Sequence, residues 1–190
     1  MTNNNPHERT ILVFGAHNDD QLIGVGGTIA KYAQEGINVR VYIFSYGESS
    51  HPHYKKRTIA KIRQNECAKS DKVLGIKETV FLGLKEGSFE EEFTKKHKHQ
   101  LKEAIETYNP EKIFLHSRDD PHPDHRAVHK MVNRILDELD YQKPVYTYEI
   151  WNPFTFRETN APKLVVDITQ TFPKKLRSFY CHESKRMTMI

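Results

Sequence analysis

The chain has 190 residues, a length that suits one domain spanning residues 1–190 with a core of its own. Hydrophobic residues make up 37% and charged residues 28%, a composition typical of globular proteins. The formal net charge is +4, from 29 basic and 25 acidic residues spread along the chain. Because there is no arginine-rich stretch and no basic patch interleaved with aromatic residues, the sequence argues against nucleic acid as a partner.

The first residues and the two cysteines indicate the compartment. The first ten residues are polar and contain no apolar signal region, and residues 1–9 are expected to be flexible. No stretch approaches the roughly 20 apolar residues that a membrane span needs. Cys67 and Cys181 lie far apart and belong to no CxxC pair, which favours reduced thiols over a disulfide framework. We therefore expect a cytoplasmic protein, and the sequence leaves a homo-oligomer open.

Apolar runs and helical patterns alternate along the chain. Residues 10–16 form an apolar run rich in branched side chains, typical of a strand that a parallel sheet buries on both faces. In chain order we predict a strand at 10–16, a helix that follows Asp20 and ends at Gly36, a strand at 39–44, a helix at 54–74, a strand at 79–82, a helix at 93–108, a strand at 112–116, a helix at 123–139, strands at 145–151 and 163–168, and a helix from 172 onward. This alternation predicts an α/β fold with a mostly parallel sheet, in which ligands bind beyond the carboxyl ends of the strands.

The first of two chemically unusual segments follows the first predicted strand. His17-Asn18-Asp19-Asp20 places an imidazole and two adjacent carboxylates at the mouth of a buried strand. Adjacent carboxylates repel each other, and a divalent cation relieves that repulsion far better than a helix N-terminus does. His17 and Asp20 are three residues apart and can reach one ion, which leaves Asp19 free. The alternative is that one aspartate only caps the following helix.

The second segment, residues 118–125, follows the strand at 112–116. His122 and His125 are three apart at the start of a helix and share a face, and imidazole suits zinc and its neighbours. Asp124 can hydrogen-bond a histidine and fix its tautomer. The alternative is a solvated loop with capping aspartates, since a lone His-x-x-His is a weak signal.

Two histidine–carboxylate clusters at strand ends are more informative together than either is alone. His17, Asp20 and His125 would supply the three ligands of a catalytic zinc site with an open position. Asp19 is then available as a general base, and His122 as an acid or an oxyanion donor.

The motifs resemble those of the PIG-L/LmbE-like deacetylases, which carry a His-Pro-Asp-Asp block and a His-Pro-Asp-His block. The resemblance covers almost the whole chain and rests on 17–20 and 122–125, Gly26-Gly27-Thr28, Arg63-Gln64-Asn65-Glu66 with Leu74-Gly75, Phe81-Leu82-Gly83-Leu84, and Tyr180-Cys181-His182-Glu183-Ser184.

This resemblance implies a Rossmann-like three-layer α/β/α fold and a zinc-dependent amidase, or one using another divalent metal, acting on N-acetylglucosamine units. It assigns metal binding to His17, Asp20 and His125, the base role to Asp19 and transition-state stabilisation to His122. It also matches Arg63 to a substrate-contacting arginine. The small-molecule partner would be an amino sugar.

Three departures from the family pattern concern the surroundings of the site. Asn18 replaces a proline, which we expect only to loosen the turn, while Gln21 and Lys185 replace a glutamate and a glutamine. The glycines at 24, 26 and 27 lie inside the predicted helix, so we interpret them as close packing rather than a dinucleotide fingerprint.

Two alternatives to sugar deacetylation remain open from the sequence. One is an amidase acting on another sugar conjugate, in thiol-cofactor or lipid-anchor synthesis. The other is a non-catalytic sugar- or metal-binding module, against which the free carboxylate of Asp19 argues.

Overall fold

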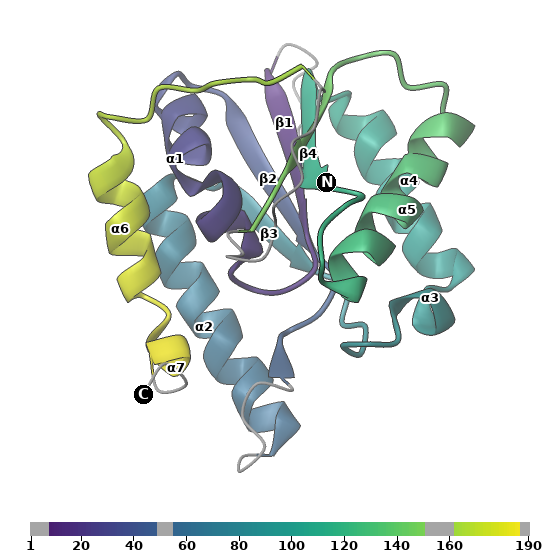
Figure 1. Ribbon diagram of the computed structural model, residues 1–190, viewed down its shortest axis with the longest axis horizontal. Coiled ribbons are helices and arrows are strands. Elements are labelled where there is room, and N and C mark those ends of the chain that lie inside the picture. Colours follow the sequence, from purple (N-terminus) through teal and green to yellow (C-terminus); the bar gives the residue numbers. More distant parts are fainter. Residues whose placement is uncertain (1–7, 49–54, 151–161, 187–190) are drawn as a thin grey trace.

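The computed structural model describes residues 8–48, 55–150 and 162–186 of the chain (Figure 1). Its elements are, in chain order, β1 (Thr10–Gly15), α1 (Asp20–Gln34), β2 (Asn38–Ile43), α2 (Lys56–Leu74), β3 (Glu78–Phe81), α3 (Phe89–Glu92), α4 (Lys95–Tyr108), β4 (Lys112–His116), α5 (Pro123–Glu138), β5 (Val145–Tyr148), α6 (Phe172–Tyr180) and α7 (Glu183–Arg186). The predicted alternation of strands and helices is confirmed from β1 to β5.

The five strands form one sheet in the order β3-β2-β1-β4-β5, and every pairing is parallel. β1 is therefore the central strand, as its two-sided apolar character predicted. The chain runs outward from β1 through β2 to β3 and then returns to β4 on the other side. This reversal makes the carboxyl ends of β1 and β4 neighbours, which is where parallel α/β sheets bind ligands.

Helices cover both faces of the sheet, so the fold is the expected three-layer α/β/α arrangement. α1, α2 and α6 lie on one face, and α3, α4 and α5 lie on the other (Figure 1). Side chains along β1 alternate between the two resulting cores: Leu12 and Phe14 pack with α4 and α5, while Ile11 and Val13 pack with α1 and α2.

Helix α1 lies unusually close to its neighbours because of two glycines. A Cβ on Gly24 would stand 2.3 Å from the ring of Tyr148, and one on Gly27 would stand 2.5 Å from Ile168. Both distances are below van der Waals contact, so only glycine fits. The close-packing interpretation is confirmed for Gly24 and Gly27 but not for Gly26, whose added Cβ would lie 3.4 Å from its nearest neighbour.

The predicted strand at 163–168 is wrong. In place of a strand, these residues run over α1 toward α6 (Figure 1), with Val165 88% exposed. Two contacts hold the segment on α1: Lys31 Nζ donates to the Asp167 carbonyl at 3.1 Å, and Ile168 packs on Gly27. An apolar run alone did not reveal that the sheet ends at β5.

Smaller corrections concern the ends of helices and strands. The helix predicted at 93–108 begins at Lys95 because Thr94 caps it, and a short helix, α3, lies just before it in a stretch where the sequence predicted no helix or strand. The C-terminal helix is divided into α6 and α7. The strand predicted at 145–151 is too long, because β5 ends at Tyr148 and residues 149 and 150 form no strand. Residue 151 and residues 1–7, most of the segment expected to be flexible, lie outside the described residues. No helix among those described is both long enough and apolar enough to cross a membrane.

Candidate metal centre and active site

The loop after β1 is a tight turn that brings His17 and Asp20 together. The Asp20 amide donates to the His17 carbonyl at 3.3 Å, and the His17 amide donates to Asp20 Oδ2 at 2.7 Å. The turn leads directly into α1, so the carboxylate of Asp20 lies at the helix N-terminus, where negative charge is favoured. Asp20 is buried.

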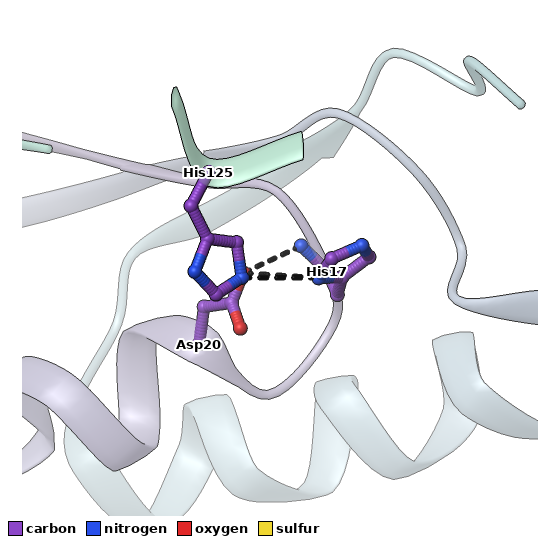
Figure 2. A group of neighbouring side chains, drawn as sticks. All are labelled: His17, Asp20 and His125. Carbon is purple, nitrogen blue, oxygen red and sulfur yellow. Dashed lines mark hydrogen bonds and ion pairs between the residues drawn. The ribbon is translucent and has the colours of Figure 1, made fainter. Parts of the chain in front are cut away.

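Helix α5 supplies the third donor. His125 lies in the first turn of that helix and is buried against the loop after β1 (Figure 2). Its Nε2 is 3.4 Å from His17 Nδ1 and 3.5 Å from Asp20 Oδ2, and His17 Nδ1 is also 3.5 Å from Asp20 Oδ2. The three atoms thus form a nearly equilateral triangle.

This triangle has the dimensions of one face of a tetrahedral metal site. Ligand bonds of about 2.0–2.1 Å arranged tetrahedrally place the donor atoms roughly 3.3–3.4 Å apart. Two imidazole nitrogens and a carboxylate oxygen at this spacing fit a divalent ion such as zinc without rearrangement. His17, Asp20 and His125 therefore form a group that could hold a metal.

Two other triads of metal-type side chains share these histidines. One comprises His17, His122 and Asp124, and the other comprises His116, Asp120 and His125. The second of these is buried throughout and offers a substrate no access. The triad of His17, Asp20 and His125 combines a mutually compact donor set with a position on the cleft described below, which makes it the strongest candidate of the three.

Carboxylates outside the triad contact both of its imidazoles. Asp124 Oδ2 is 3.1 Å from His17 Nε2, and Asp120 Oδ1 is 2.9 Å from His125 Nδ1. Asp124 also accepts the Gly87 amide at 3.1 Å, which fixes the carboxylate. Such contacts orient the rings and increase their basicity toward a metal. The sequence placed Asp124 in this kind of contact but gave Asp120 no role.

The electrostatics of the cluster favour a cation between its carboxylates. Burial lowers the pKa of His17, but hydrogen bonds to Asp124 and Asp20 outweigh it and raise that pKa to about 10. Burial raises the pKa of Asp20, yet the imidazoles of His116 and His17 hold it well below its usual range. The same negative charge that retains a proton on His17 would stabilise a bound divalent ion.

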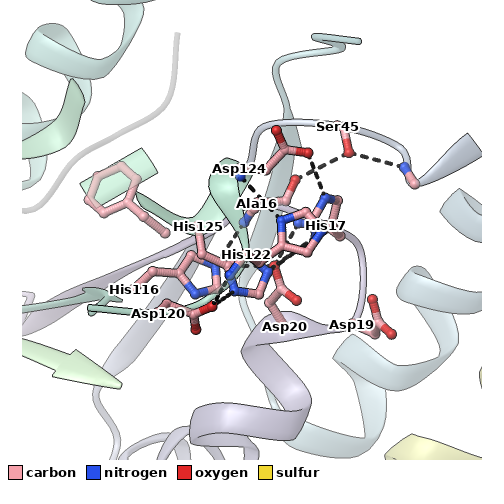
Figure 3. Close-up of polar contacts among 12 residues, drawn as sticks. Ala16, His17, Asp19, Asp20, Ser45, His116, Asp120, His122, Asp124 and His125 are labelled. Atoms are coloured by element: carbon pink, nitrogen blue, oxygen red, sulfur yellow. Dashed lines mark hydrogen bonds and ion pairs between the residues drawn. The ribbon is translucent and has the colours of Figure 1, made fainter. Parts of the chain in front are cut away.

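Asp19 lies to one side of the imidazole cluster, separate from the triad (Figure 3). Its Oδ1 is 3.8 Å from Nη2 of Arg63, a residue of α2 that is only 1% exposed. Arg63 Nη1 donates to the Gly47 carbonyl, and Asn18 Nδ2 donates to the Arg63 carbonyl at 2.6 Å. Asn18 thus ties the turn to α2, so the expectation that it only loosens the turn is wrong.

His122 is the N-cap of α5 and faces the same space. Its Nδ1 accepts the Asp124 amide at 3.2 Å, which leaves Nε2 as the protonated nitrogen of the neutral ring. Burial, followed by the neighbouring His17 and His125, lowers the pKa of His122. A neutral ring with a fixed Nε2–H can donate a hydrogen bond to an oxygen in the cleft.

All seven predicted site residues border one cleft of about 690 Å³. Its lining comprises the predicted residues His17, Asp19, Asp20, Arg63, His122, Asp124 and His125, together with Ile23, Glu86, Gly87, Pro123, Ile150 and Phe179. Apolar side chains alternate with charged ones, as in pockets that bind small molecules. The structure brings the predicted residues together but does not by itself assign their roles.

Three polar residues near the site received no role from the sequence. His116 ends β4 behind the triad, Asp120 contacts His125, and Glu86 lines the cleft. The signal for His116 was present: it is a titratable side chain at the last position of a buried strand whose carboxyl end faces the site. Glu86 lies in a loop whose position the sequence pattern leaves undefined.

A parallel α/β sheet with a His-Asp-His group that could hold a metal, open to a cleft and beside a separate carboxylate, is an arrangement typical of the class of metal-assisted hydrolases. Within that class, the pattern of the PIG-L family, described as GlcNAc-PI de-N-acetylase, matches residues 12–136. The chain therefore belongs to the PIG-L family.

Similar proteins with assigned names include both deacetylases and a hydratase. A probable N-acetyl-alpha-D-glucosaminyl L-malate deacetylase 2 of Bacillus anthracis is 24% identical over 97% of this chain and 84% of its own length. The diacetylchitobiose deacetylase of Thermococcus kodakarensis is 26% identical over 93% of this chain and 70% of its own. The 4-oxalmesaconate hydratase of Pseudomonas putida is 27% identical over 94% of this chain and 75% of its own length.

Solved structures show the same fold. The hydratase GalB of Pseudomonas putida superposes with a TM-score of 0.78 at 21% identity, covering 95% of this chain and 81% of that one. The N,N'-diacetylchitobiose deacetylase of Pyrococcus horikoshii gives a TM-score of 0.75 at 23% identity, covering 97% of this chain and 74% of that one.

Proposed function

We propose that the protein is a metal-dependent hydrolase that removes the N-acetyl group from an N-acetylglucosamine-type sugar or conjugate and releases acetate. The observation that carries this proposal is the triangle of His17 Nδ1, Asp20 Oδ2 and His125 Nε2, with edges of 3.4–3.5 Å, on the same cleft as Asp19. We infer that the ion is zinc, since two imidazoles and one carboxylate form a common zinc set, although other divalent ions also accept it.

The metal would supply Lewis acidity, which makes water easier to deprotonate and the acetyl carbonyl easier to attack. The chain's own residues would do the rest. Asp19 takes the proton from the attacking water, a role that suits a carboxylate on the cleft but outside the ligand triangle. Arg63 pairs with the Asp19 carboxylate at 3.8 Å and borders the cleft, and we propose that it contacts the substrate there.

His122 is placed to act on the developing oxyanion. Its Nε2–H is the free donor of a ring whose Nδ1 is occupied by the Asp124 amide. Donation to the carbonyl oxygen lowers the barrier most when that oxygen carries negative charge. Water then adds to the amide, the C–N bond breaks, and the amine leaves with a proton delivered by Asp19 or His122, with acetate as the second product.

An amino-sugar substrate agrees with both the relatives and the charge of the cleft. Two of the named relatives are deacetylases of N-acetylglucosamine derivatives or chitobiose. Among the described residues that line the cleft, Arg63 carries a guanidinium charge, whereas the acidic side chains are those of Asp19, Asp20, Glu86 and Asp124. This balance suits a neutral sugar that becomes a cationic amine better than it suits a substrate with several carboxylates.

Two other activities remain as alternatives with a specific relative behind each. The Mycothiol S-conjugate amidase of Streptomyces coelicolor, 28% identical over 64% of this chain, supports an amidase on another sugar conjugate. The Pseudomonas putida hydratase supports addition of water to a carbon–carbon double bond. A non-catalytic binding module is the least favoured, because Asp19 stands beside the site without belonging to the triad.

The setting of the enzyme is also proposed. We infer a cytoplasmic protein from its composition and from its two free cysteines, without a nucleic-acid partner and with a homo-oligomer compatible with the sequence.

The test is acetate release from a panel of N-acetylated sugars, from the monosaccharide to chitobiose and sugar conjugates. We expect release from at least one member, its loss on treatment with a chelator, and its recovery on adding back zinc. A chelator-insensitive activity contradicts the metal role. Release of no acetate from any member, together with hydration of an unsaturated dicarboxylate, favours the hydratase alternative.

A further inference from the structure

His116 is a buried histidine that contacts Asp20, His125 and the backbone beside His17 without belonging to the triad. It ends β4 and is 0% exposed. Its Nε2 lies 3.1 Å from Asp20 Oδ2, and its ring stacks on that of His125 with centroids 3.9 Å apart and an interplanar angle of 10°. The amide of Ala16, the residue before His17, donates to the same Nε2 at 3.0 Å.

These contacts join two segments that are far apart in sequence (Figure 3). The loop after β1 carries His17 and Asp20, and α5 carries His125, about a hundred residues later. One imidazole thus contacts Asp20 by a polar atom, His125 by its face, and the backbone next to His17. A shift of His116 would change the edges of the donor triangle.

The ring of His116 is itself held in place. Tyr148 Oη lies 3.4 Å from its Nε2 and donates to the Phe14 carbonyl at 2.8 Å, so β5 and β1 fix the tyrosine. The adjacent Gly24 leaves room for the tyrosine ring, which a Cβ would displace. The sheet therefore holds Tyr148 in place, and the tyrosine in turn restricts the ring of His116 beside the proposed metal site.

We propose that His116 is a positioning residue that holds Asp20 and His125 at metal-binding distance through two separable features, its polar Nε2 and its flat ring. This inference rests on the metal site of the proposed function but not on the reaction. Contacts of this kind typically change metal affinity by about 10- to 100-fold when removed.

Two substitutions separate the features. His116→Phe keeps a flat ring against His125 but removes the nitrogen that accepts the Ala16 amide hydrogen and lies 3.1 Å from Asp20 Oδ2. His116→Gln returns a polar group near the Nε2 position while losing the aromatic face. We expect His116→Phe to bind Zn²⁺ about 10- to 100-fold more weakly than wild type. We expect His116→Gln to recover most of that loss.

A matched control is available in His182, another buried histidine. Its Nε2 lies 3.2 Å from Ser70 Oγ on α2, and it does not line the cleft. His182→Phe should lower the unfolding temperature while leaving zinc affinity unchanged. Comparison of the two Phe variants separates positioning of the ligands from general destabilisation.

The experiment is a titration of each full-length apo-protein with Zn²⁺ against a chromophoric chelator, with unfolding temperatures measured on the same samples. Co²⁺ substitution adds a spectroscopic readout, because its visible absorption reports ligand geometry. We expect an altered Co²⁺ spectrum for His116→Phe and a wild-type spectrum for His182→Phe. Should His116→Phe not fold, His116→Leu replaces it; because Leu removes the nitrogen and the aromatic face together, we expect its zinc affinity to fall at least as far as that expected for His116→Phe.

Four results would overturn the inference. The first is a His116→Phe variant with the zinc affinity and Co²⁺ spectrum of wild type. The second and third are zinc affinities in His116→Gln, or in His182→Phe, that are as low as in His116→Phe. The fourth is a wild-type protein that binds no zinc. Acetate release does not enter the measurement. A wild type that binds zinc but releases no acetate therefore refutes the proposed function and leaves this inference standing.

Discussion

Replacing Asp19 by Asn separates its proposed chemical role from its structural one. The substitution keeps the size of the side chain but removes the charge and the base. Removal of a general base typically lowers turnover by about 10²–10⁴-fold, which is roughly 3–5 kcal/mol of barrier at 1.36 kcal/mol for each factor of ten. Because Asp19 lies outside the donor triangle, the variant should still bind one metal ion.

The same substitution has a cost in stability that can be worked out from the structure. Arg63 is almost completely buried, and Asp19 Oδ1 lies 3.8 Å from its Nη2, so Asn leaves a buried guanidinium without that anion. The remaining bond to the Gly47 carbonyl limits the loss, which we estimate at about 1–3 kcal/mol. For a chain of this size, each kcal/mol lowers the unfolding temperature by roughly 2–4 °C.

The assay combines metal content, acetate release and thermal unfolding on one preparation of each variant. Asp119→Asn is the control, since Asp119 pairs with Arg118 outside the cleft. Adding Arg63→Met to Asp19→Asn should recover stability but not turnover. If Asp19→Asn loses its metal, Asp19 is a ligand and the division of roles between the two aspartates is reversed. If it keeps metal and full turnover, the base lies elsewhere, and His122 is the next candidate.

Two further predictions concern stability. Burial raises the pKa of Asp71 from 3.8 to about 6, so the fold loses stability as pH rises through that window. Asp71→Asn should therefore be more stable than wild type by up to about 3 kcal/mol above pH 7 and by almost nothing near pH 3. Denaturant unfolding at the two pH values checks this, and an equal difference at both contradicts it. Gly24→Ala should lower the free energy of unfolding by about 1–3 kcal/mol, because the new Cβ would lie 2.3 Å from the ring of Tyr148. Gly26→Ala should be tolerated, because the atom nearest to its Cβ belongs to the flexible side chain of Lys175, at 3.4 Å. Equal unfolding temperatures for the two alanine variants would contradict the packing argument.

The parts of the fold that sequence predicted are those that local pattern determines. The apolar run of β1 indicated a strand buried on both faces, and that strand is central. The run at 163–168 carries a similar pattern and forms no strand, because the contacts that draw it over α1 come from Lys31 and Gly27, residues more than 130 positions away. A local pattern contains no information about such partners.

The candidate site shows the same division. Residue type and spacing selected His17, Asp20 and His125, because metal ligands must combine suitable chemistry with strand-end positions. His116 was passed over, since its importance depends on contacts with Ala16 and Asp20 that exist only after β4 pairs with β1. The pairing of Arg63 with Asp19 likewise depends on how α2 packs, and no spacing in the sequence indicates it.

The most direct test of the account is the metal content of the purified protein and of its His125→Ala variant. Elemental analysis after zinc loading and removal of free metal gives the number of ions per chain. We predict one ion in wild type, close to none in His125→Ala, and one in His182→Ala, which removes a buried histidine away from the cleft. A full equivalent of metal in His125→Ala would contradict the assignment of His17, Asp20 and His125 as the metal site.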